Sequence, residues 1–137
     1  MAVATPVQSL PDPPDDLPPA AAEMFRRAVT ELASRGLREG DLEAITMMCW
    51  SAYVHAEARE QIVRTGVLVK GPRGPMVNPL IKVARDEAAT YLRIADAFGL
   101  TLASRLRLGL MQLAGESLLK ALNDDLDAPD VGVRVNV

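Results

Sequence analysis

Few residues of this 137-residue chain have side chains suited to catalysis. Cys49 is the only cysteine and His55 the only histidine, so one chain can form neither a disulfide nor a metal site of several thiolates or imidazoles. Cys49 falls on an apolar helix face, where a free thiol is usually inert. His55 lies within a predicted helix, where a packing role is commoner than catalysis. We therefore expect no metal, no cofactor and no enzymatic activity.

Two other patterns do not complete a known site. The glycines at residues 66–74 are not followed by the Lys-Ser or Lys-Thr pair of a phosphate-binding loop. Asp124, Asp125, Asp127 and Asp130 lack the glycine and glutamate of a calcium-binding loop. We interpret these four carboxylates as a solvated acidic tail.

The charged residues divide the chain into three parts. Residues 1–58 have a net charge of −5, residues 59–107 of +5 and residues 108–137 of −3. The overall charge of −3 alone argues against a nucleic-acid partner. The basic middle part leaves two interpretations open, a solvated face or a surface for phosphate, which arginine binds bidentately. Lys82 and Asp86 lie four residues apart on a predicted helix, so part of the positive charge is expected to be paired.

Hydrophobic periodicity predicts a mainly α fold, a helical core of about four helices with one small β-hairpin. The helices are expected over residues 20–35, 42–65, 79–98 and from 102 to about 122. Two short apolar runs around the Gly/Pro-rich turn at residues 71–74 predict the hairpin. Gly109 and Gly115 interrupt the last helical region, which is therefore expected as one kinked helix or two short ones.

Particular residues are expected to begin the helices. Asp41, Asn78 and Thr101 are predicted as N-caps, with Pro79 in the first helical position after Asn78. The apolar run at residues 47–50 has two interpretations, a core position or a subunit interface. Both depend on how the second helix is packed.

The order of motifs between residues 66 and 108 is itself informative. The motifs are Gly66-Val67-Leu68-Val69, Gly71-Pro72-Arg73-Gly74, Val77-Asn78-Pro79-Leu80-Ile81-Lys82-Val83-Ala84, Phe98-Gly99-Leu100-Thr101 and Ser104-Arg105-Leu106-Arg107-Leu108. In this order they resemble the small terminase subunits of tailed phages, and the resemblance covers roughly residues 11–108. The chain has Leu102 where that family often has proline.

The resemblance implies a function and partners. Small terminase subunits assemble as rings, bind viral DNA for packaging, and pass it to a large subunit that holds the ATPase and nuclease and that they regulate. For this chain the resemblance implies a ring-shaped homo-oligomer, double-stranded viral DNA, the large terminase subunit, the host bacterial cytoplasm and no membrane. A ring would repeat a modest basic patch and so gain avidity. The candidate DNA contacts are Arg64, Lys70, Arg73, Lys82, Arg85, Arg105 and Arg107.

The expected organisation has three parts. Residues 1–19, with six of the ten prolines, form an extended or disordered tail. Residues 20–125 form a helical domain for DNA binding and oligomerisation. Residues 126–137 form a tail in which valine alternates over residues 131–137, a strand pattern that we expect to pair with neighbours in the ring or with the large subunit. Two alternatives remain, a helical transcription regulator that binds an operator as a dimer and a helical adaptor that binds only protein.

Overall fold

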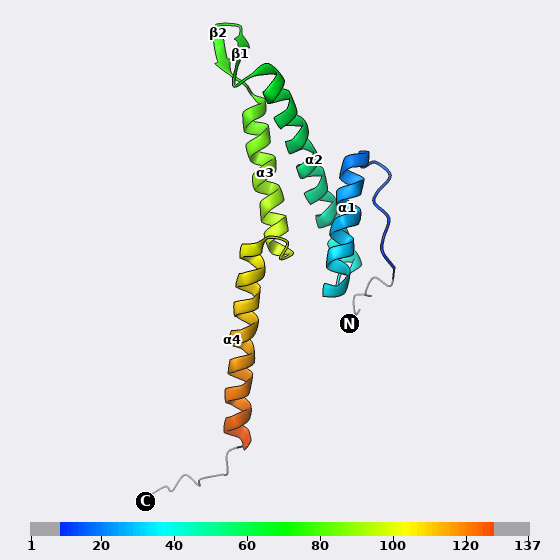
Figure 1. Ribbon diagram of the computed structural model, residues 1–137, viewed down its shortest axis with the longest axis vertical. Coiled ribbons are helices and arrows are strands. Elements are labelled where there is room, and N and C mark those ends of the chain that lie inside the picture. Colours follow the sequence, from blue (N-terminus) through cyan, green and yellow to red (C-terminus); the bar gives the residue numbers. More distant parts are fainter. Residues whose placement is uncertain (1–8, 128–137) are drawn as a thin grey trace, which may run out of the picture. The chain divides into compact units, whose positions relative to one another are not determined.

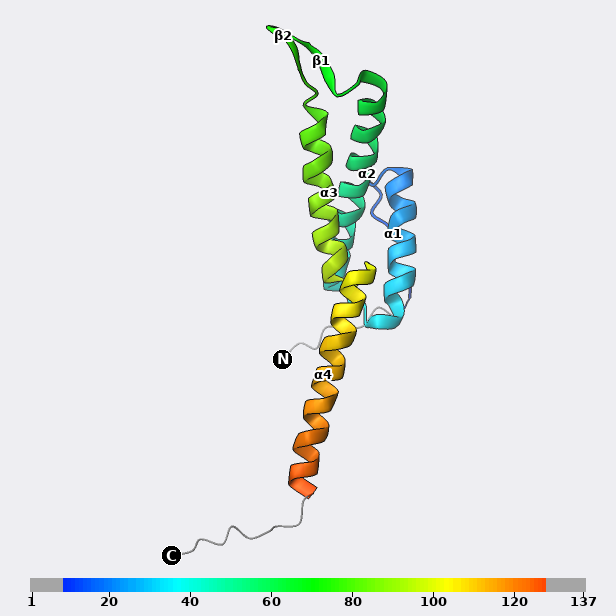
Figure 2. The same cartoon turned by 60° about the vertical axis from the view of Figure 1, so that its left-hand side comes forward.

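The helices α2 and α3 lie side by side, and a β-hairpin joins them at one end (Figure 1, Figure 2). The computed structural model describes residues 9–127, in two units that meet at Phe98 and Gly99. The predicted mainly α fold with one small hairpin is confirmed. The elements are α1 (Pro19–Leu32), α2 (Leu42–Thr65), β1 (Leu68–Gly71), β2 (Gly74–Val77), α3 (Leu80–Ala97) and α4 (Leu102–Asp127), with 3-10 turns at Ala33–Arg35 and Glu39–Asp41.

The predicted core of about four helices has to be corrected to three. Helices α1, α2 and α3 belong to the first unit, whereas α4 belongs to the second. The large apolar side chains of α4 are 45–82% exposed. Periodicity detects apolar residues but not what they pack against, which is why the fourth helix was expected in the same core. Helix α4 is continuous through Gly109 and Gly115, so the alternative of two short helices is wrong.

The core of the first unit begins with one face of α1. Phe25 and Val29 are each 1% exposed, and they lie four residues apart on the predicted stripe. Helix α2 contributes Ile45 and Met48, which are 0% and 3% exposed. Leu17, in the segment before α1, is also buried. Residues 9–18 form no helix or strand, yet they supply one side chain to the core.

The contact between α2 and α3 depends on small residues. Ala58 of α2 and Ala95 of α3 are buried, and short side chains let two helices approach closely. His55 forms a hydrogen bond across this contact, with its Nδ1 2.9 Å from the carbonyl oxygen of Ala84. A carbonyl oxygen only accepts, so Nδ1 carries the proton. His55 thus links α2 to α3.

The ends of α2 are formed differently. At the C-terminus, Gly66 has φ +90 and its amide donates to the carbonyl of Ile62 at 2.7 Å, and glycine tolerates this positive φ without strain. At the N-terminus, Asp41 holds the predicted N-cap position of α2, but its side chain does not cap the helix. Its carboxylate accepts the backbone N–H of Arg38 at 3.0 Å and makes no side-chain cap to α2. The 3-10 turn before α2, which the sequence pattern did not indicate, uses this carboxylate.

Candidate nucleic-acid interface

The β-hairpin displays two of the predicted basic residues. Strands β1 and β2 pair antiparallel from Leu68 opposite Val77 to Gly71 opposite Gly74, so that residues 72–73 form the loop. Gly74 has φ +112, a conformation that favours glycine. Lys70 and Arg73 are both exposed near the tip. The predicted hairpin and the position of these two cations at its tip are confirmed.

Asn78 fixes the base of the hairpin to both helices. Its Oδ1 accepts the amide of Leu80 at 3.0 Å, as predicted for an N-cap. Its Nδ2 donates to Thr65 Oγ1 at 2.9 Å and to the Gly66 carbonyl at 3.0 Å, and its own amide donates to the carbonyl of Val67 at 2.7 Å. Asn78 is buried, with 3% of the residue exposed. Asn78 therefore orients the hairpin relative to the ends of α2 and α3.

The first unit gathers five of the seven candidate DNA contacts around the hairpin. Arg64 lies in the last turn of α2, and Lys82 and Arg85 lie in the first two turns of α3. These three residues and the two hairpin residues belong to the hairpin and to the helical ends next to it; Figure 1 shows the hairpin at that end of α2 and α3. Arg105 and Arg107 belong to α4 in the second unit. Arg59, another exposed α2 residue of the same basic segment, was not among the seven candidates.

Three of the seven candidates have an internal partner. Arg64 pairs with Glu60 at 2.5 Å, and Lys82 pairs with Asp86 at 2.6 Å, which confirms the predicted Lys82 pairing. The hydrogen bond from Lys82 lowers the pKa of the Asp86 carboxyl. Both pairs are exposed, and solvent screens exposed ion pairs strongly, so phosphate can compete for them.

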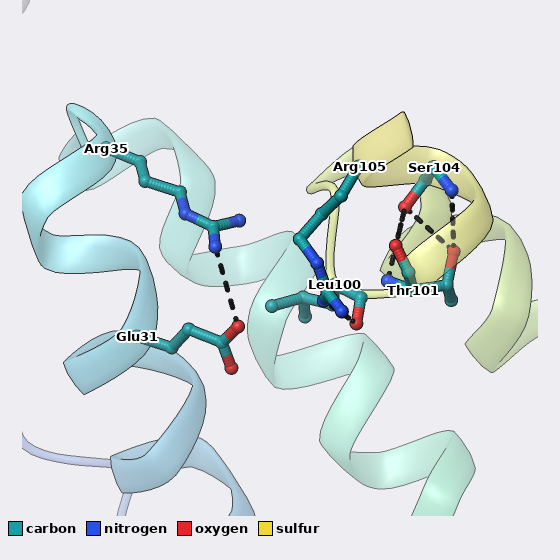
Figure 3. A network of polar contacts seen from close by, with 6 residues as sticks. All are labelled: Glu31, Arg35, Leu100, Thr101, Ser104 and Arg105. Atoms are coloured by element: carbon teal, nitrogen blue, oxygen red, sulfur yellow. Dashed lines mark hydrogen bonds and ion pairs between the residues drawn. The ribbon is translucent and has the colours of Figure 1, made fainter. Parts of the chain in front are cut away.

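Arg105 is the third partnered candidate. Its Nη1 donates to the carbonyl of Leu100 at 2.9 Å, as Figure 3 shows. Within residues 9–127, no ion pair engages the remaining four candidates. They are Lys70, Arg73, Arg85 and Arg107.

The start of α4 is held by a reciprocal cap between Thr101 and Ser104 (Figure 3). The Ser104 amide donates to Thr101 Oγ1 at 3.1 Å, and the Thr101 amide donates to Ser104 Oγ at 3.2 Å. Ser104 Oγ also donates to the Thr101 carbonyl at 2.9 Å. Ser104 thus takes the position of the glutamate in a capping box. The predicted N-cap at Thr101 is confirmed.

The surroundings of Cys49 do not favour a reactive thiol. Cys49 is buried, and burial raises the pKa of its thiol to about 11, which the charge of Arg27 offsets in part. Within the described part of the chain, no cluster of three or more His, Cys, Asp or Glu side chains is placed to hold a metal. Among those same residues, no helix is both long and apolar enough to cross a membrane.

The chain thus folds into helices, with a basic hairpin between the antiparallel helices α2 and α3. The family model for the phage terminase small subunit matches residues 21–112. That match covers more than half of the chain, so the chain belongs to this family, and the resemblance found in the motifs is confirmed. Membership gives it a general role in viral DNA packaging. Comparison with curated proteins and with solved structures found no match.

Proposed function

We propose that this protein is the DNA-recognition subunit of the packaging machinery. In this proposal several copies form a closed ring, bind double-stranded viral DNA through the hairpin end of the first unit, and regulate the large terminase subunit. The observation that supports DNA binding best is the position of Lys70 and Arg73 at the tip of a hairpin whose base is fixed by Asn78. A fixed base reduces the entropy lost when the tip binds phosphate.

The net charge of −3 is compatible with this proposal because the cations are concentrated. Between residues 59 and 87 the chain has six lysines and arginines against three carboxylates. Such a patch attracts the DNA backbone locally even when the whole chain is acidic. Its repetition around a ring multiplies the contacts and so gives avidity without new interactions in each copy.

Ring assembly is supported by the surface of α4. Among the described residues, this helix exposes ten large apolar side chains. They are Leu102, Leu106, Leu108, Leu110, Met111, Leu113, Leu118, Leu119, Leu122 and Leu126. Large apolar side chains exposed in this number are typical of interaction sites. We propose that contacts between copies cover part of it.

The test of DNA binding replaces the hairpin cations. The variant with Lys70→Gln and Arg73→Gln is measured for duplex binding by fluorescence anisotropy over a salt series. Each phosphate contact contributes about 0.9 to the slope of log affinity against log salt. We expect weaker binding and a slope reduced by about two for each protomer that contacts DNA.

A matched control replaces two cations of α1, Arg26→Gln and Arg27→Gln, which lie outside the hairpin end. This variant loses the same charge and is expected to keep the wild-type slope. Equal effects of the two variants would show that only net charge matters and would refute the hairpin as the contact. No duplex binding by the wild type at low salt would favour a protein-only adaptor.

The valine-rich segment at residues 131–137 lies outside the described residues. We keep the proposal that it acts between chains, either with neighbouring copies or with the large subunit. Deletion of residues 128–137 is expected to change the oligomer size or to weaken binding to the large subunit, measured by light scattering and pull-down. If both stay unchanged, the segment has no such role.

A further inference from the structure

Two large apolar side chains of α2, Met47 and Trp50, are exposed although the residues between them are buried. Met47 is 60% and Trp50 47% exposed, whereas Met48 and Cys49 are at 3% and 0%. Successive helical side chains differ by about 100° in direction, so a run of four cannot all face one core. The structure therefore divides this run between core and surface.

Met47 and Trp50 line a groove in the first unit, which we name the acidic groove. It consists of two hollows of about 520 and 350 Å³ that share Asp16, Thr46 and Met47 in their lining. Every charged residue of the lining is a carboxylate: Asp12, Asp16, Glu43 and Glu87. Within the part of the chain that the structure describes, none of these four forms an ion pair.

The first half of α4 has the complementary character. Residues 102–113 include Arg105 and Arg107 and no carboxylate, because the first acid of α4 is Glu116. Leu106 and Leu110 in this segment are 60% and 68% exposed. A basic and apolar helix surface matches an acidic and apolar groove in both charge and hydrophobicity.

Gly109 also gives α4 a depression suited to a large side chain. A hollow of about 410 Å³ there has Arg105, Leu106 and Leu110 in its lining. A Cβ placed on Gly109 would meet no atom within 4 Å. Trp50 is the largest exposed side chain of the acidic groove, and tryptophan is a frequent anchor in the pockets of protein interfaces.

We propose that residues 102–113 of α4 in one copy bind in the acidic groove of a neighbouring copy, with Trp50 over Gly109. This inference rests on the proposed ring and identifies the two surfaces that join its copies. In this contact Arg105 and Arg107 pair with carboxylates of a neighbouring copy and do not contact DNA. Because the two surfaces differ, the contact is heterologous, and heterologous contacts form rings when the rotation between neighbours closes.

Charge favours this occupant over the N-terminal segment. Residues 1–8 contain no lysine or arginine and so lack side chains that match four carboxylates. The acidic lining also disfavours DNA, whose phosphates it repels. Binding of α4 to the groove of its own chain is the remaining alternative, and the experiment separates it from binding between copies.

The experiment exchanges the charges of the two surfaces in separate full-length variants. One variant has Asp16→Lys and Glu87→Lys in the groove, and the other has Arg105→Glu and Arg107→Glu in α4. The first variant places two lysines of the groove opposite the arginines of α4, and the second places two glutamates of α4 opposite the carboxylates of the groove, so we expect light scattering to show loss of the wild-type oligomer. Mixed in equal amounts, each variant has the surface that the other needs, and we expect an oligomer to form in which the two variants alternate.

Three results would overturn the inference. They are retention of the wild-type mass by either variant alone, a mixture that stays dissociated, and a wild type that is monomeric. A dissociated mixture beside an oligomeric wild type refutes only this contact, whereas a monomeric wild type refutes the proposed ring as well. A variant with Asp124→Lys and Asp125→Lys, outside the proposed contact, should keep its mass.

A second variant tests the Trp50 contact without changing charge. Gly109→Leu fills the depression, and leucine favours a helix over glycine by roughly 1 kcal/mol, so α4 itself should remain folded. We expect loss of the oligomer with helix content retained in circular dichroism. An unchanged oligomer would contradict the placement of Trp50 over Gly109.

Discussion

At the scale of single residues, the Cys49 thiol makes stability depend on pH. Burial raises its pKa from 9.0 to about 11, so the folded state holds this proton more tightly than the unfolded chain does. The resulting stabilisation is complete below pH 9 and is lost as pH rises through about 11. At about 1.4 kcal/mol per unit, the loss is roughly 2–3 kcal/mol.

Urea unfolding at several pH values measures this effect. The wild type should lose more stability between pH 8.5 and 11.5 than the variant Cys49→Ala, because the other titrating groups are common to both. Parallel pH profiles for the two proteins would contradict the raised pKa.

Asn78 is the second residue with a measurable effect. Asn78→Asp keeps the oxygen that accepts the Leu80 amide but removes the Nδ2 donor to Thr65 and Gly66. A buried acceptor left without its donor costs about 1–3 kcal/mol. We expect that loss in unfolding free energy together with weaker DNA binding, since the hairpin base is no longer fixed. Asn123→Ala, at an exposed position of α4, is the control and should match the wild type.

At the scale of elements, the start of α4 depends on its cap. Ser104→Ala removes the hydroxyl that joins the amide and the carbonyl of Thr101. Thr101 Oγ1 still accepts the amide of residue 104, so the variant loses only the reciprocal half of the cap, and a typical hydrogen bond contributes about 0.5–1.5 kcal/mol; amide exchange in the first turn of α4 should therefore accelerate. Ser117→Ala, at an exposed position of the same helix, should leave it unchanged. Equal exchange in both variants would show that the cap contributes nothing.

Local sequence signals predicted most elements because local interactions define them. The hairpin follows from its Gly/Pro-rich turn, and the caps at Asn78 and Thr101 follow from side chains that reach amides two or three residues away. The role of Asn78 as a link to Thr65 could not be predicted, because that hydrogen bond spans 13 residues. For the same reason, apolar periodicity predicted α4 as a helix but not that it belongs to a different unit from the other three helices.

For the candidate interface, the sequence predicted which cations could contact DNA but not how each of them is paired. Their types and the charge of the middle segment are visible in the sequence, but their pairing depends on rotamers and neighbours. Helical spacing indicated the Lys82 pair with Asp86, and the structure adds the pairing of Arg64 and the hydrogen bond of Arg105. The acidic groove combines side chains of the N-terminal segment with those of three helices, so its composition required the tertiary fold.

At the scale of the whole molecule, positive and negative surfaces have separate proposed partners. The hairpin end offers cations to DNA, and the acidic groove offers carboxylates to α4 of a neighbour. A salt series should therefore weaken DNA binding steeply. Contacts between copies that bury leucine and tryptophan side chains should depend less on salt, because the hydrophobic contribution is not screened.

The most direct test of the proposed ring is the solution mass of the wild type, measured by light scattering at low and high salt with and without duplex DNA. The account predicts one species of many protomers at both salt concentrations, which binds duplex at low salt and releases it at high salt. A monomer under every condition would contradict the account. A dimer that binds paired half-sites would identify the protein as an operator-binding regulator instead.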